Sequence, residues 1–169
     1  MAEPGTSNGL IDDFFLKISG IEGESQDAKH SGEIQVLGFD MGLANRGRRG
    51  DYKVGKVTFD DAKFRAYIDQ SCPKLQLACA TGDHLATAVL TVRKQGKIQQ
   101  EYLKITLSDC VVTSCKVVTH DPNDLLPMME FSLSFSKKQI EYREQKQDGS
   151  LGGAITASVD IKKNTAVSA

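Results

Sequence analysis

The sequence predicts a mainly β protein: an antiparallel β-barrel of two packed sheets, with about ten strands, flanked by one short α-helix. Many separate runs alternate apolar and polar residues with a period of two, which is typical of strands that bury one face. Turn residues divide these runs at short intervals. One segment, at 71–81, has helical spacing instead. A sheet must also protect its strand edges, and pairing them with another copy is one solution.

The strand predictions follow from individual runs. Phe131, Leu133 and Phe135 alternate with serines, so one face of that run is apolar and the other is polar. Similar runs, bounded by turn residues, predict the other strands. The predicted strands are 14–18, 33–41, 54–58, 62–69, 86–94, 102–107, 111–119, 131–136, 139–144 and 155–161. Gln95-Gly96-Lys97 predicts the hairpin turn between two of them.

Residues 71–81 predict the helix. Ser71 is placed to cap its N-terminus, and Pro73 falls in the first turn, where the missing N–H costs little. Gly82 is placed to adopt the left-handed conformation that ends a helix. Cys79 shares its face with apolar residues, so we expect its thiol to pack rather than to react.

One domain accounts for the chain, because 169 residues suit a single domain and the sequence contains no internal repeat or linker. We expect this domain to span residues 1–169, with an ordered core over about 12–162. The first nine and last six residues are expected to be mobile. Residues 46–55 are rich in Gly and Arg and have no apolar period, which predicts a loop; 120–124 predict another.

Composition and charge exclude several classes of protein. Hydrophobic residues make up 40%, enough for a packed core. No apolar run approaches the roughly 18 residues of a membrane span, so we expect no membrane insertion. The net charge of −1 provides no general attraction to nucleic acid, and we expect none to bind. The N-terminus lacks the positive flank and apolar run of a secretory signal, which indicates synthesis and folding in the cytoplasm.

The four cysteines are expected to be free and mostly buried. None forms a Cys-x-x-Cys pair, and a cytosolic chain of this length does not need disulfides. They are Cys72, Cys79, Cys110 and Cys115.

No motif in the chain predicts a reaction, a cofactor or a metal site. Residues 50–56 have the glycine and lysine spacing of a phosphate-binding loop, but Val57 stands where a Ser or Thr would hold magnesium. The acidic pairs at 12–13 and 60–61 occupy adjacent strand positions, which point to opposite faces. The histidines lack partners at metal-ligand spacing, and we expect them at the surface or at strand edges. They are His30, His84 and His120.

Charge is unevenly distributed along the chain. Residues 1–40 contain eight acidic and two basic side chains, for a net charge of −6. Residues 41–56 contain five basic and one acidic side chain, for a net charge of +4. Two unlike faces favour head-to-tail contacts, which build rings or open stacks. An ordinary solvated loop explains the basic segment equally well, so charge alone leaves both interpretations open.

Three blocks of the sequence together resemble one protein family. The first begins with FLKISGIEGESQDAKH at 15–30, the second contains YIDQSCPKLQLACATGDH at 67–84, and the third, from residue 127, closes with DGSLGG at 148–153. In this order the blocks resemble the Hcp proteins, the tube subunits of type VI secretion systems. The resemblance covers most of residues 14–162.

The resemblance implies a β-barrel flanked by one helix, and it implies a function without a reaction. Hcp subunits are expected to form hexameric rings that stack head to tail into a hollow tube. A contractile sheath surrounds the tube and a spike protein caps it, and contraction expels both to the outside or into a target cell. The lumen carries or chaperones effectors. For this chain we therefore expect self-association, sheath, spike and cargo as partners, and no enzymatic activity.

The resemblance also places candidate contact residues. The family's extended loop falls near 47–56, where it is expected to reach the neighbouring ring. The stacking candidates are Gly47, Arg48, Arg49, Gly50, Tyr52 and Lys53. The strand at 33–41 is a candidate for the lumen wall, with Asp40 as the lumen residue. A period of two places Asp40 on one face with Ile34 and Val36, and leaves open which face lines the hole.

Two alternative functions remain at this point. The same fold builds phage and prophage tail tubes, although the blocks around His30 and 73–82 favour the secretion branch. A small β-barrel hydrolase, or a tube domain that bears a toxin, is the other alternative. Because the chain continues for about sixteen residues after Gly153, we expect no further folded domain there.

Overall fold

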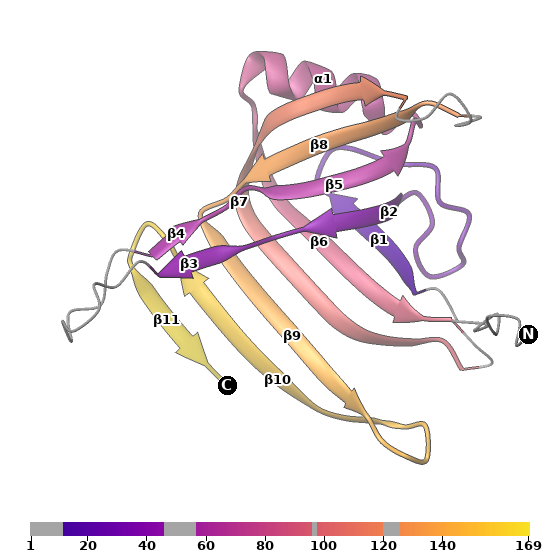
Figure 1. The fold of residues 1–169 in the computed structure, drawn as a ribbon, viewed down its shortest axis with the longest axis vertical. Coiled ribbons are helices and arrows are strands. Elements are labelled where there is room, and N and C mark those ends of the chain that lie inside the picture. Colours follow the sequence, from indigo (N-terminus) through magenta and orange to yellow (C-terminus); the bar gives the residue numbers. More distant parts are fainter. Residues whose placement is uncertain (1–11, 46–56, 96–97, 120–125) are drawn as a thin grey trace, which may run out of the picture.

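The computed structural model describes residues 12–45, 57–95, 98–119 and 126–169. They form eleven strands and one helix (Figure 1). In chain order these are β1 (Asp13–Ile18), β2 (Ile34–Asp40), β3 (Leu43–Asn45), β4 (Val57–Phe59), β5 (Ala62–Tyr67), α1 (Ser71–Thr81), β6 (His84–Lys94), β7 (Gln100–Val118), β8 (Met128–Ser134), β9 (Lys137–Gln145), β10 (Leu151–Asp160) and β11 (Thr165–Ser168). The predicted mainly β fold with one short helix is confirmed.

Six strands close into a barrel. Their order around it is β7, β6, β1, β2, β5 and β8, and β8 pairs again with β7. Every one of these pairings is antiparallel. Closure gives each of the six strands a neighbour on both sides, which protects their edges.

Two further groups of strands are attached to the barrel. β9 pairs with the first half of β7, and β10 and β11 continue the same sheet outward. We call these three strands the flange. β3 and β4 pair only with each other among the described residues and form a separate ribbon between β2 and β5. In Figure 1 the flange and the ribbon both extend beyond the barrel.

The structure differs from the predicted strands at β7. The predicted strands 102–107 and 111–119 are parts of one strand of 19 residues. Between them Asp109 has a φ of 55°, in the left-handed region that Asp tolerates better than most residues. The gap between the two predicted strands therefore coincides with a local change of backbone conformation within a continuous strand.

The two chain ends have different outcomes. The last six residues were expected to be mobile, but Thr165–Ser168 form β11, which pairs with the end of β10. Ala169 adds two backbone hydrogen bonds with Thr156, both 2.8 Å long. The expectation for the first nine residues lies outside the described residues.

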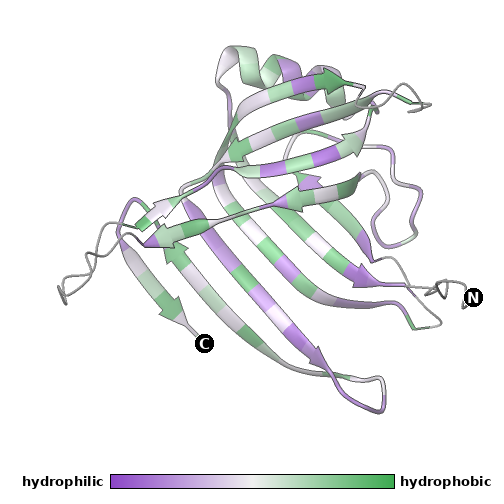
Figure 2. Ribbon diagram, in the orientation of Figure 1, coloured by the Kyte–Doolittle hydropathy of each residue, from purple (hydrophilic) through white to green (hydrophobic). Residues whose placement is uncertain are grey.

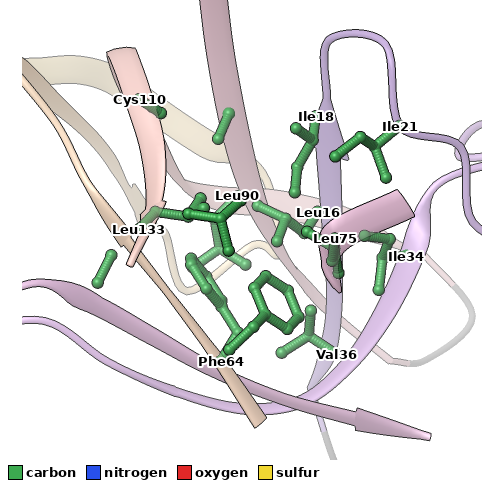
Figure 3. Close-up of a cluster of buried hydrophobic side chains, with 14 of the residues drawn as sticks. Leu16, Ile18, Ile21, Ile34, Val36, Phe64, Leu75, Leu90, Cys110 and Leu133 are labelled. Atoms are coloured by element: carbon green, nitrogen blue, oxygen red, sulfur yellow. The ribbon is translucent and has the colours of Figure 1, made fainter. Parts of the chain in front are cut away.

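The core fills the barrel and continues under the helix. Leu16, Ile34, Leu90 and Leu133 are at most 1% exposed and come from four different barrel strands. Figure 3 shows them packed with Leu75 of α1, so the helix shares one core with the barrel. Burial of such side chains stabilises the fold by about 1.5–3 kcal/mol each.

Helix α1 begins differently from the prediction. Ser71 is not the cap but the first helical residue, and it is fully buried. The Asp69 carboxylate accepts hydrogen bonds from the Ser71 backbone N–H, at 2.8 Å, and from its hydroxyl. Asp69 therefore satisfies a free N–H that a cap would otherwise satisfy. The predicted helix end is confirmed, because Gly82 has a φ of 71° and its N–H bonds to the Ala78 carbonyl at 2.9 Å.

All four cysteines are free, as predicted. Cys72 and Cys110 are buried, and Cys79 and Cys115 are half-buried. Burial raises the pKa of both Cys110 and Cys115 to about 11, so neither thiol ionises readily at neutral pH. Within the described residues no helix has the length and apolarity to cross a bilayer.

Candidate assembly surfaces

A polar cluster around Asp109 connects β7 to β6 and to the turns next to β9 and β10. Asp109 accepts hydrogen bonds from His84 Nδ1 at 2.9 Å, Ser136 Oγ at 2.7 Å and Lys162 Nζ at 2.5 Å. The hydrogen bond from Lys162 contributes most to holding the pKa of Asp109 well below its usual range, and the bonds from Ser136 and His84 add to the effect. His84 and Ser136 both bond to Asp109, not to each other, so this is not a nucleophile with its base. His84 lies at the surface, as predicted.

His30 does not lie at the surface, contrary to the prediction. It is 6% exposed, and its ring stacks on Phe15 with 4.3 Å between ring centroids. Nδ1 lies 2.9 Å from Glu33, and Nε2 lies 2.9 Å from Glu101 on β7. His30 therefore fixes the segment 19–33 against the barrel wall. His120 lies outside the described residues.

Arg93 fixes the same segment from β6. It is 2% exposed, and it donates hydrogen bonds to Asp27 at 2.7 and 3.0 Å and to Asp13 at 3.0 Å. Its guanidinium carbon also lies 4.8 Å from the centroid of Phe15. The hydrogen bond from Arg93 lowers the pKa of Asp27 to about 2. Arg93 could not be recognised from the sequence, because its partners lie 66 and 80 positions away in the chain.

The opening block of the sequence therefore has a structural role. Its backbone folds back on itself, with the Gly23 N–H bonded to the Gly32 carbonyl at 2.8 Å. A Cβ at residue 23 would lie 2.5 Å from the Glu33 carbonyl oxygen, so only glycine fits there. The Gly, Glu, Asp and His of this block therefore hold the loop 19–33 against the barrel.

The ribbon β3–β4 carries the predicted stacking loop. Leu43 pairs with Phe59, and Asn45 pairs with Val57 at the end of the ribbon. All of β3 is exposed, including Leu43 at 56%. The predicted contact residues Gly47, Arg48, Arg49, Gly50, Tyr52 and Lys53 lie outside the described residues. Their role remains a prediction, although the ribbon places both ends of that segment beyond the barrel (Figure 1).

A β-bulge corrects the predicted faces of β2. Val36 lies opposite the buried Ala66, but after a register shift between Val36 and Gly38 it is Phe39 that lies opposite the buried Phe64. Because an extra residue reverses the alternation, Asp40 does not share a face with Ile34 and Val36, as the period of two had predicted. Asp40 is exposed and lies opposite Lys63. Its role in the lumen remains a prediction.

The outer face of β2, β5, β8 and the end of β7 is hollowed, and charged and polar side chains line the hollow together with apolar ones. The hollow has a volume of about 610 Å³. Across it Arg65 donates hydrogen bonds to Glu130 at 2.9 and 3.2 Å. Its other polar lining residues are Asp40, Lys63, Ser114, Lys116 and Ser132. Within the described residues, no group of three His, Cys, Asp or Glu side chains is placed to hold a metal ion.

The described residues thus form a closed barrel with one covering helix, a projecting ribbon, a flange and an outer hollow. Comparison with known proteins identifies its family. Residues 15–142 match the family model of the type VI secretion system effector Hcp. The chain is 38% identical over 157 residues to protein hcp1 of Pseudomonas aeruginosa, across 90% of this chain and 96% of that protein.

Solved structures agree with this match. Hcp1 from Salmonella typhimurium is 35% identical, with a TM-score of 0.79, over 92% of this chain and 99% of that one. A type VI secretion system effector from Yersinia pestis is 32% identical, with a TM-score of 0.72, over 88% of this chain and 99% of that one. The chain belongs to the Hcp family, and it is a structural tube protein of type VI secretion. The Hcp resemblance seen in the sequence is thus confirmed.

Proposed function

We propose that this chain forms hexameric rings that stack head to tail into the inner tube of a type VI secretion system, with effectors carried in the lumen. The observation that carries the proposal is the family match over residues 15–142, which runs through all six barrel strands and into β9. Hcp proteins are secreted and structural. For this chain we propose synthesis in the cytoplasm, expulsion without a signal peptide, a sheath and a spike protein as partners, and no catalytic reaction.

The proposed contact between stacked rings is the loop carried by the ribbon. Residues 41–56 have a net charge of +4, and residues 1–40 have a net charge of −6. Opposite charges on two ends of a subunit favour head-to-tail contact and penalise the reversed orientation. The ribbon supports this role because it extends beyond the barrel, where a loop at its end has access to another subunit.

The proposed lumen wall is the outer hollow, with Asp40 among its residues. Charges of both signs occur there, such as the Arg65–Glu130 pair. A wall of this kind keeps its hydration, because its polar groups bind water as readily as they bind a cargo protein. Cargo would therefore be held weakly and released easily, which suits a carrier.

Size-exclusion chromatography with light scattering, followed by negative-stain imaging, tests the proposal. Six copies of the 18.4 kDa chain have a mass of about 110 kDa, and we expect annular particles at that mass. A monomer at every concentration, with no rings in the presence of other tube components, would contradict the proposal.

Reversing the charge of Arg48 and Arg49 together is expected to weaken stacking and to leave the rings intact. Placing like charges at the contact between rings should raise the dissociation constant for stacking at least about tenfold. Filament length in negative stain is the measurement, with ring mass as the internal reference. Lys74→Glu, on the exposed side of α1, is the control and should stack normally. Filaments of unchanged length in the double variant would remove the loop from the stacking contact.

A further inference from the structure

The flange continues the inward face of the barrel. Residues directly opposite in an antiparallel pair share a face. Ile140 of β9 lies opposite Ile105 of β7, whose side chain is 4% exposed in the core. Tyr142 lies opposite Leu103, and Ile155 of β10 lies opposite Tyr142. Ile140, Tyr142 and Ile155 therefore lie on the sheet face that the barrel buries.

On the flange, however, that face has no core to cover it. The exposed fraction rises from 36% at Ile140 to 44% at Tyr142 and 67% at Ile155. The opposite face of the same strands is polar, with Gln139, Glu141, Arg143, Ser158 and Asp160. Figure 2 shows the apolar and polar positions alternating along β9 and β10. The alternation that predicted a buried face is present, and no described part of the chain buries it.

Two observations favour a second copy of this chain as the partner of the apolar face of β9 and β10. Hcp proteins self-associate, so a neighbouring copy is available. The apolar face is also continuous with the barrel core through β7, as expected of an interface that resembles a core cut in half.

Exposed apolar side chains also occur toward the other end of the molecule. Leu77 of α1 is 63% exposed, and Val117 near the end of β7 is 51% exposed. Figure 1 shows α1 at one end of the long axis and the β9–β10 hairpin at the other. Unlike apolar surfaces at two ends allow a head-to-tail contact, which repeats and closes into a ring when the rotation permits.

We propose that the apolar face of β9 and β10 is one half of the contact between neighbouring subunits within the ring, with a second copy of this chain as its occupant. The inference rests on the proposed function, because it requires a ring. It adds to that function the surface through which neighbouring subunits make contact. Ile140, Tyr142 and Ile155 become buried only on assembly.

The test is the substitution Ile155→Asp in the full chain. Its folding should be unchanged, because the side chain is mostly exposed in the single chain; denaturation of the monomer checks this. Light scattering should show the ring dissociating at concentrations at least about a hundredfold higher than for the wild type, since a charge would be buried at the contact without a partner. Gln139→Asp is the matched control. It is exposed on the opposite face, beside the uncharged Thr106 and Ser158, and should form normal rings.

The outcomes separate this inference from the proposed function. Normal rings from the wild type and from Ile155→Asp alike would overturn the inference and leave the ring proposal standing; the face would then be free for another protein. A wild type that never forms rings would overturn both. Should Ile155→Asp fold poorly, Tyr142→Lys places a charge on the same face, and the same ring loss is expected from it.

Discussion

Arg93→Met is expected to lower the free energy of unfolding by about 3–5 kcal/mol. Met preserves much of the side-chain volume but removes the guanidinium that bonds to Asp13 and Asp27. Those side chains are 14% and 21% exposed, so two carboxylates would remain close together with little water and no cation. Chemical denaturation of the wild type and the variant measures the difference.

The pH dependence of that loss provides its control. Arg93 holds the pKa of Asp27 at about 2, below the ordinary 3.8. A carboxyl with a lowered pKa contributes stability above its ordinary pKa, and the contribution is lost as the pH falls through the folded value. The difference between wild type and Arg93→Met should therefore be largest above about pH 4 and shrink toward pH 2. A constant difference would mean that lost packing, and not the ion pair, destabilises the variant.

Phe131→Ala is expected to cost a similar amount, about 3–5 kcal/mol, for a different reason. Phe131 lies on β8, the strand that closes the barrel, and it is 2% exposed. Its ring stacks on Phe64 with 5.3 Å between centroids, and Cys115 lies opposite it on β7. Truncation would leave a cavity between the two strands that β8 joins.

A second truncation separates packing from mere loss of apolar area. Leu77→Ala also removes an apolar side chain, but Leu77 is 63% exposed on α1, so its cost to the folded monomer should stay below about 1 kcal/mol. The free energy of unfolding of each variant, measured under conditions that keep the protein monomeric, makes the comparison. Equal losses of unfolding free energy in the two variants would be incompatible with tight packing of Phe131 between β5 and β7.

The sequence predicts most of the fold because alternation is a local signal. The run that became β5 buries alternate residues, as the period of two requires. In β1 and β6 the core face alternates as predicted, but Phe15 and Arg93 on the other face are buried as well, because the segment 19–33 packs against them. The signal fails where one residue breaks the alternation. The bulge after Val36 reverses the faces of β2, and its position is set by pairing with β5, about 30 positions later in the chain. No pattern within β2 contains that information.

The candidate sites were harder to predict for related reasons. Arg93 occupies an ordinary strand position, and its importance comes from Asp13 and Asp27, which reach it only in the folded chain. His30 follows a turn, which indicates a surface residue, yet the loop folds inward onto Phe15. Resemblance to the Hcp family identified the function without assigning a structural role to either residue. The stacking loop around Arg48 remains a prediction, because it lies outside the described residues.

The strand order around the barrel also constrains how the protein is made. Phe14 of β1 pairs with Val92 of β6, and Tyr67 of β5 pairs with Met128 of β8. While the nascent chain is still emerging from the ribosome, β1 can pair with β2 but must wait for β6, and the barrel must wait for β8. Contacts this distant in sequence slow folding and prolong the exposure of unpaired edges. Closure of the barrel is therefore a late event in the synthesis of each subunit.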